Sequence, residues 1–220
     1  MSGKLRQKLR PRAKVLMTVI AVAVIAVLGA GQQASANIVG SVHDFSSLAF
    51  TTEICVVCHT PHNADLSVSD APLWNHEVTT STFTVYSSGT LDAVVGQPDG
   101  VSKLCLSCHD GSVAVDNFGG TTLGTTFVGT LNADAELGTD LTNDHPVSFI
   151  FDAALATSDG ELFDPTSTSS GLGSTIDADM LFAGKVQCAS CHDVHDKDEN
   201  GFLLRKVNTG SALCLTCHDK

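Results

Sequence analysis

All eight cysteines of this 220-residue chain occur in four copies of Cys-x-x-Cys-His. The copies are Cys55/Cys58/His59, Cys105/Cys108/His109, Cys188/Cys191/His192 and Cys214/Cys217/His218. Two thiols at this spacing can bond to the two vinyl groups of one haem as thioethers, and the histidine that follows can bind the iron. The pattern therefore predicts four covalently attached haem c groups, each with one of these histidines as its proximal iron ligand.

Zinc ribbons and disulfides are the alternative uses of these cysteines. Two Cys-x-x-Cys pairs also suit tetrahedral zinc, but zinc needs no histidine after every second cysteine. A disulfide framework would need a cross-linking partner, and no cysteine lies outside a motif. The motif pattern therefore favours haem over both alternatives.

Five further histidines could bind the opposite face of an iron: His43, His62, His76, His145 and His195. Methionine is the other common distal ligand of haem c. The chain has only three methionines, however, and two of them, Met1 and Met17, lie in a segment that we interpret below as a cleaved export signal. Met180 alone cannot supply four distal ligands. The histidine count thus predicts four six-coordinate, bis-histidine haems of low potential.

An internal repeat indicates two haem pairs and a pairing of ligands. The first and third motifs continue as Cys-x-x-Cys-His-x-x-His, and the second and fourth share Leu-Cys-Leu-Ser/Thr-Cys-His-Asp. We expect the extra histidine of each first motif to ligate the second haem of its pair, and the histidine preceding each pair to ligate the first haem. The expected pairs are His62 with His109, His195 with His218, His43 with His59 and His145 with His192, which leaves His76 over.

The first 36 residues have the pattern of an export signal. A basic stretch from Lys4 to Lys14 precedes the apolar run Val15–Ala30, and Ala34-Ser35-Ala36 fits a small-x-small cleavage site. A retained membrane anchor is the rival interpretation, because the apolar run is only slightly shorter than the roughly 18 residues of a spanning helix. We expect cleavage, and an exported mature chain 37–220 without a stable membrane span.

The mature chain is strongly acidic. The signal takes six of the twelve basic residues and none of the 24 acidic ones, which leaves a net charge of −18. Such a surface is unsuited to nucleic acid, and it does not attract oxyanions. It also favours ferric over ferrous haem, which lowers the potentials.

The expected fold is a multihaem cytochrome c: mostly irregular backbone, short helices at the haem motifs, a few short strands, and haems forming much of the core. The 184 mature residues leave only 46 for each motif. We expect one domain over 37–220, built from haem pairs at about 37–110 and 185–220 and joined by a Gly/Ser/Thr/Asp-rich segment. Brief strands are expected at Ser112–Val115 and Val147–Phe151. Two independent domains are less favoured, because each half has little apolar sequence with which to form a core.

One acidic segment resembles part of a calcium loop. Asp196 to Gly201 match the first half of that loop, but the twelfth position is Val207 rather than the bidentate glutamate. A solvated turn is therefore the expected structure at 196–201.

With these residues in view, the chain resembles the doubled-CxxCH multihaem cytochromes, and among them the extracellular tetrahaem nanowire subunits of the OmcE type. The resemblance spans the mature chain and lies in the following segments: 40–45 (Gly-Ser-Val-His-Asp-Phe), 58–62 (Cys-His-Thr-Pro-His), 72–76 (Pro-Leu-Trp-Asn-His), 143–146 (Asn-Asp-His-Pro) and both Leu-Cys-Leu-Ser/Thr-Cys-His-Asp motifs. It implies a secreted subunit that polymerises with copies of itself into a filament and exchanges electrons with redox partners at the cell surface. It also implies that a neighbouring subunit supplies one distal histidine. His62 is then the first candidate, with His76 completing the His109 haem, and His43 is the second.

Two other functions compete with conduction along a filament. A soluble periplasmic shuttle could use the same four haems. A multihaem reductase would need an iron with an open position, and five non-proximal histidines for four sites argue against one. We therefore expect an electron-transfer protein and not an enzyme.

Overall fold

The computed structural model describes residues 38–69, 71–195 and 200–220. The predicted signal peptide lies outside the described residues, as do positions 196–199 of the possible calcium loop. The described residues from 38 onward belong to one compact unit, Ala36–Lys220. Within them, no helix has the length and apolar character needed to cross a membrane.

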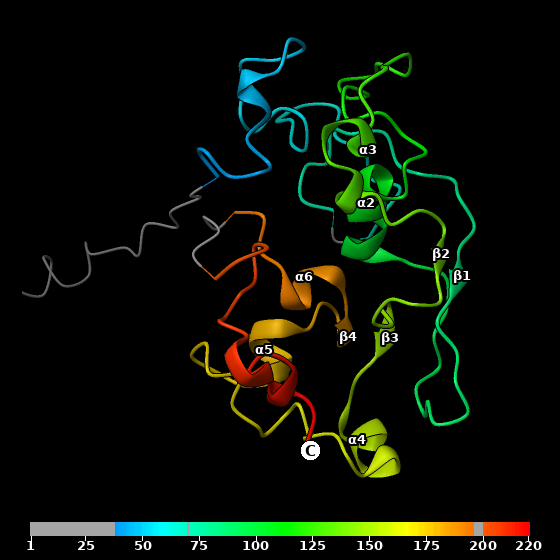
Figure 1. Ribbon diagram of the computed structural model, residues 1–220, viewed down its shortest axis with the longest axis vertical. Coiled ribbons are helices and arrows are strands. Elements are labelled where there is room, and N and C mark those ends of the chain that lie inside the picture. The colour runs from blue at the N-terminus through cyan, green and yellow to red at the C-terminus, as the bar shows by residue number, and fades with distance from the viewer. Residues whose placement is uncertain (1–37, 70, 196–199) are drawn as a thin grey trace, which may run out of the picture. The chain divides into compact units, whose positions relative to one another are not determined.

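Short helices separated by irregular backbone make up most of the described chain, as predicted (Figure 1). The longest helix, α2, covers ten residues. The α-helices are α2 (Gly100–His109), α3 (Val128–Leu131), α4 (Ala153–Asp159), α5 (Ile176–Met180) and α6 (Cys188–Cys191). The 3₁₀ helices are η1 (Phe45–Ser47), η2 (Ala133–Ala135), η3 (Thr209–Ser211) and η4 (Cys214–Thr216).

A polar side chain and a glycine set the two ends of α4. Asp152 accepts a hydrogen bond from the backbone N–H of Leu155 at 2.8 Å and so caps the first turn of α4. The same helix ends at Gly160, whose φ of 74° is readily adopted only by a residue without a Cβ. Local capping thus supports this seven-residue helix, which has only Ala156 buried.

The strands are equally short and form two separate pairs. β1 (Thr84–Val85) runs parallel to β2 (Asp140–Leu141), with Thr84 opposite Asp140. β3 (Phe149–Ile150) runs antiparallel to β4 (Lys185–Val186), with Phe149 opposite Val186. The second pair places β4 directly before the third cysteine motif.

One strand prediction was right and the other was wrong. β3 lies inside the predicted segment Val147–Phe151. Ser112–Val115 forms bends and turns instead of a strand. Its β-branched and apolar side chains are buried, and Val115 donates only a single ladder-like hydrogen bond, to the Thr126 carbonyl at 2.7 Å. Burial, rather than strand pairing, accounts for the apolar character of this segment.

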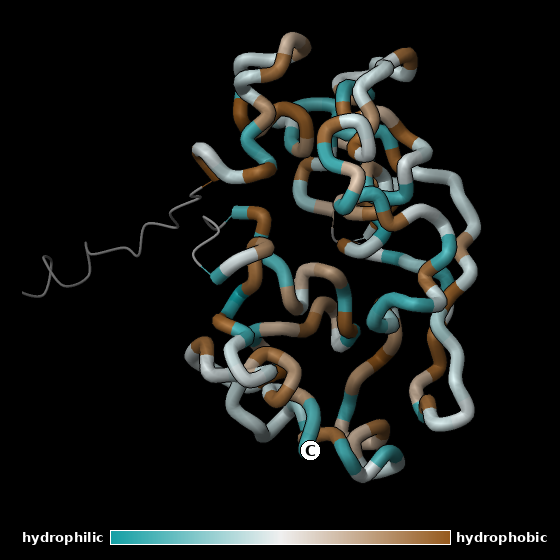
Figure 2. The backbone as a smooth tube through the Cα atoms, viewed as in Figure 1, coloured by the Kyte–Doolittle hydropathy of each residue, from teal (hydrophilic) through white to brown (hydrophobic). Residues whose placement is uncertain are grey.

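Three small apolar clusters replace a single large core. The largest contains Phe149, Phe151, Ala156, Ile176, Met180, Val186 and Leu213, and Cys191 and Cys217 pack against it. A second contains Val68, Trp74 and Leu104, with Cys58 beside it. The third contains Phe83, Leu106 and Leu141. Figure 2 shows apolar and polar stretches alternating over short distances along the chain.

A buried polar contact ties the segment before β1 to the second motif. Thr79 donates its N–H to Ser107 Oγ at 3.0 Å and its hydroxyl to Asp110 Oδ2 at 2.5 Å. Both Thr79 and Asp110 are buried. The contact fixes the backbone that immediately follows His109.

Replacing Thr79 with valine should lower the free energy of unfolding by about 1–3 kcal/mol, because the buried Asp110 carboxylate loses a donor. Denaturant unfolding of the purified protein measures the loss. Thr80→Val, at an exposed neighbouring position, is the matched control. Equal stabilities for the two variants would contradict the expected role.

Candidate haem-binding sites

Each Cys-x-x-Cys-His motif forms a single helical turn. The backbone N–H of His59 bonds to the carbonyl of Cys55 at 2.9 Å, and the third and fourth motifs repeat the bond at 3.1 Å. In the second motif the turn is the last part of α2. Residues three and four positions apart lie on one face of a helical turn. The two thiols and the imidazole of each motif therefore face the same side, as attachment to one haem requires.

Backbone carbonyls orient the rings of three proximal histidines. The Nδ1 atom of His59 lies 2.6 Å from the Pro72 carbonyl oxygen. His109 Nδ1 makes the same contact with Ala135 at 2.7 Å, and His192 Nδ1 with Phe202 at 2.8 Å. An Nδ1–H donated to a carbonyl leaves Nε2 as the free lone pair for a metal. Nothing in the sequence marks Pro72, Ala135 and Phe202 as partners of these histidines, because they act through backbone carbonyls, which every residue has.

Three proximal histidines each face one other histidine ring. The ring centroids of His59 and His195 are 6.0 Å apart, those of His43 and His109 are 6.1 Å apart, and those of His145 and His218 are 6.3 Å apart. A histidine nitrogen binds a metal such as zinc at about 2.0–2.1 Å, so two imidazoles on opposite sides of one ion have centroids about 6 Å apart. The three pairs thus have the separation that one iron between two imidazoles requires.

These pairs correct the assignment made from the repeat. His43 lies beside His109 rather than His59, and His145 lies beside His218 rather than His192. His195, expected beside His218, instead faces His59 of the other half of the chain. The repeat predicts similar local turns, but the ring opposite each turn depends on how distant segments pack.

Two of the distal candidates have pKa values lowered below that of a free imidazole. Desolvation, with the nearby His109, His192 and His195 as further causes, lowers the pKa of His43 to about 4. Its Nδ1 atom is buried without a hydrogen-bond partner. Burial also lowers the pKa of His145, whose Nδ1 lies 2.9 Å from the Pro146 carbonyl. Neutral imidazole is the form that binds metals.

The remaining three histidines, His62, His76 and His192, have different surroundings. Both ring nitrogens of His76 face backbone carbonyls, Nδ1 at 2.8 Å from Glu77 and Nε2 at 3.0 Å from Ala114. His76 therefore fits iron ligation least well of the nine. His62 is exposed and, like His76, lines a cavity of about 610 Å³. Among the described residues, neither His62 nor His192 makes a ring contact.

All eight cysteines are free thiols in this structure. Burial raises the pKa of the Cys58 and Cys217 thiols to about 11. A hydrogen bond with the Cys188 thiol raises the pKa of Cys105. The second and third motifs, which belong to different haem pairs, therefore lie side by side. Within the described residues, no group of three or more His, Cys, Asp and Glu is arranged to hold a metal ion directly.

Residues 181–220, which contain the third and fourth motifs, match the family model for the doubled CXXCH motif. Among proteins with curated descriptions, none matches the chain. The family match indicates covalently bound haem c in a multihaem c-type cytochrome, and it supports electron transfer through haem.

Proposed function

We propose that the protein transfers electrons through four covalently attached haem c groups, none of them catalytic, as the repeating subunit of an extracellular filament. The observation that carries the proposal is the set of three histidine pairs at 6.0–6.3 Å, each with one ring from a Cys-x-x-Cys-His motif. When bound, haem supplies reversible one-electron chemistry. The chain would hold the haems in place, supply ligands to the iron atoms and cover the haems with a thin layer of protein.

Each histidine has a defined role in this proposal. His59, His109, His192 and His218 are the proximal ligands. His195, His43 and His145 are the distal ligands of the His59, His109 and His218 haems, respectively. His76 is the histidine left over. The haems complete the core, because cysteines already pack against two of the three apolar clusters.

The fourth site supports assembly into a filament. His192 has no ring opposite it within the described chain, and His62 is exposed without a ring contact. In the proposed assembly, the contact that joins His62 of one copy to His192 of the next is heterologous, and His192 of the first copy is left for His62 of a third copy. Heterologous contacts that do not close into a ring produce open filaments. A metal bond across the contact would strengthen it against dilution.

The soluble periplasmic shuttle uses the same four haems without this contact. In that case His192 would need a ligand from its own chain. The reductase would need an accessible open iron, and the net charge of −18 on residues 37–220 is unfavourable for anionic substrates. Images of the native material separate these functions: a regular filament with four haem densities per subunit supports the proposal, and dispersed single subunits support the shuttle.

The assembled protein should contain only low-spin haem and should bind carbon monoxide poorly, because imidazole nitrogens occupy both faces of every iron. Its haems should titrate mostly below zero on the hydrogen scale, since bis-histidine ligation and a net charge of −18 on residues 37–220 favour the ferric state. Electron paramagnetic resonance and a redox titration of assembled material measure both properties. A substantial high-spin signal in assembled material would favour the reductase.

A further inference from the structure

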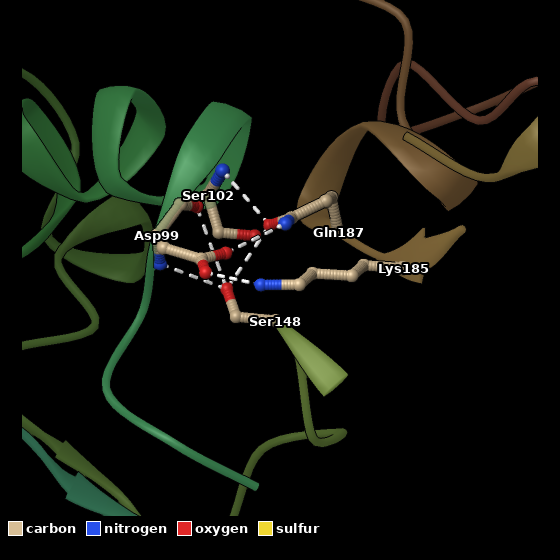
Figure 3. A network of polar contacts seen from close by, with 5 residues as sticks. All are labelled: Asp99, Ser102, Ser148, Lys185 and Gln187. Carbon is tan, nitrogen blue, oxygen red and sulfur yellow. Dashed lines mark hydrogen bonds and ion pairs between the residues drawn. The ribbon is translucent and has the colours of Figure 1, made fainter. Parts of the chain in front are cut away.

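A polar network with a buried centre joins the start of α2 to the start of α6, the helices that carry the second and third motifs. Figure 3 shows its five members, Asp99, Ser102, Ser148, Lys185 and Gln187. They come from three segments that are distant in the sequence. α2 and α6 are in contact in the fold.

Two reciprocal hydrogen bonds connect the helices directly. Ser102 Oγ accepts the backbone N–H of Cys188 at 2.9 Å. In return, Gln187 Oε1 accepts the backbone N–H of Ser102 at 3.2 Å. Ser102 is fully buried and Gln187 is 3% exposed. The first cysteine of the third motif is therefore held by a side chain that lies one helical turn before Cys105.

The other members hold Gln187 in this position. Its Nε2 donates to Asp99 Oδ1 at 3.1 Å, and its Oε1 also accepts the Ser148 hydroxyl at 3.1 Å. Ser148 Oγ in turn accepts the backbone N–H of Asp99 at 3.0 Å. Lys185 forms an ion pair with the same carboxylate. Each polar group of the Gln187 amide thus has a partner within the network.

The backbone at Ser148 also indicates that the network determines the local structure. Ser148 has a φ of 64°, which is uncommon for a residue other than glycine. Such a conformation persists where the surrounding contacts over-determine it. Ser148 immediately precedes β3, whose partner β4 leads into Gln187. The strand pair and the hydrogen bonds therefore act together on one junction.

We propose that Ser102 and Gln187 are positioning residues for electron transfer between the haems attached to the second and third motifs. The inference rests on the proposed function. The network fixes the spacing of Cys105 and Cys188, which belong to the amino-terminal and carboxy-terminal haem pairs. Because it is anchored to both helices through backbone N–H groups, it resists both separation and sliding of the two motifs.

The test compares Ser102→Ala with Ser170→Ala in the haem-loaded protein. Ser170 is also fully buried, and its Oγ accepts a backbone N–H, that of Leu172, at 2.9 Å. It lies in a turn and does not join two motifs. Gln187→Met is the second test variant, since it removes the amide and keeps the length of the side chain. Lys185→Met, which removes only the half-exposed ion pair, is a milder third variant.

Two measurements are made on each variant. Hydrogen exchange at the Cys188 amide reports the contact itself and does not depend on haem activity. Redistribution of electrons among the haems after flash photoreduction reports the rate of electron transfer between them. We expect Ser102→Ala and Gln187→Met to speed hydrogen exchange at the Cys188 amide and to slow electron redistribution several-fold, since the rate of electron transfer between two haems falls exponentially with the distance between them. Lys185→Met should change the amide-exchange rate and the redistribution rate in the same directions but by less. Ser170→Ala should change neither rate.

Two results would overturn the inference. One is unchanged exchange at the Cys188 amide in Ser102→Ala, which would mean that the contact does not hold the motif. The other is faster amide exchange with the redistribution rate of the unaltered protein, which would reduce the network to a role in stability. Failure of the proposed function has a different signature, because the unaltered protein would then show no redistribution among its haems.

Discussion

Replacing His62 with alanine should leave four attached haems but yield monomers or short oligomers in which one haem lacks its sixth protein ligand. The cysteine motifs and proximal histidines are untouched, so attachment should be unaffected. Among the described residues, His62 is the non-proximal histidine without a ring contact, and His192 is the proximal histidine without a ring opposite it. Haem content, electron micrographs and the high-spin ferric signal measure the three parts of this result.

His76→Gln is the matched control, because His76 is the other non-proximal histidine outside the three pairs. Its two ring nitrogens face carbonyls, so its loss should leave every haem low-spin in assembled material. If His76→Gln produced the high-spin signal and His62→Ala did not, His76 would be the fourth distal ligand. Long filaments of His62→Ala with every haem low-spin would mean that the crossing bond does not involve His62.

The sequence alone predicts the local part of these sites well. A Cys-x-x-Cys-His motif needs only one helical turn to bring two thiols and an imidazole to one face, and the hydrogen bond from His59 to Cys55 closes such a turn without any distant contact. Short helices and irregular backbone were likewise predictable, since the chain lacks long apolar periodicity.

The distal pairing could not be predicted in the same way, because it depends on segments that are distant in the sequence. His195 reaches His59 only because the carboxy-terminal half packs against the amino-terminal half. The repeat relates the two halves by similarity and carries no information about their contact. The network around Gln187 was missed for the same reason: a glutamine before a cysteine motif has no distinctive pattern until Ser102 lies opposite it.

Removing His43 should leave the haem of the second motif, and no other haem, without its sixth ligand. In an otherwise unaltered chain, His43→Ala should produce a high-spin signal equivalent to one haem, because its ring lies 6.1 Å from that of His109. The repeat-based assignment places His43 on the His59 haem and predicts the same signal. The single variant therefore measures the size of the effect but does not choose between the two pairings.

The choice comes from a background in which Cys105 and Cys108 are replaced by serine, so that the second haem is not attached. There, His43→Ala should add no high-spin signal, since the iron that His43 would ligate is already gone. His145→Ala should still add one haem equivalent in the same background, because its ring faces His218 of the fourth motif. A high-spin signal from His43→Ala in this background would place His43 on a different haem. The in-chain pairing would then have to be reassigned, and with it the identification of His192 as the site that a neighbouring subunit completes.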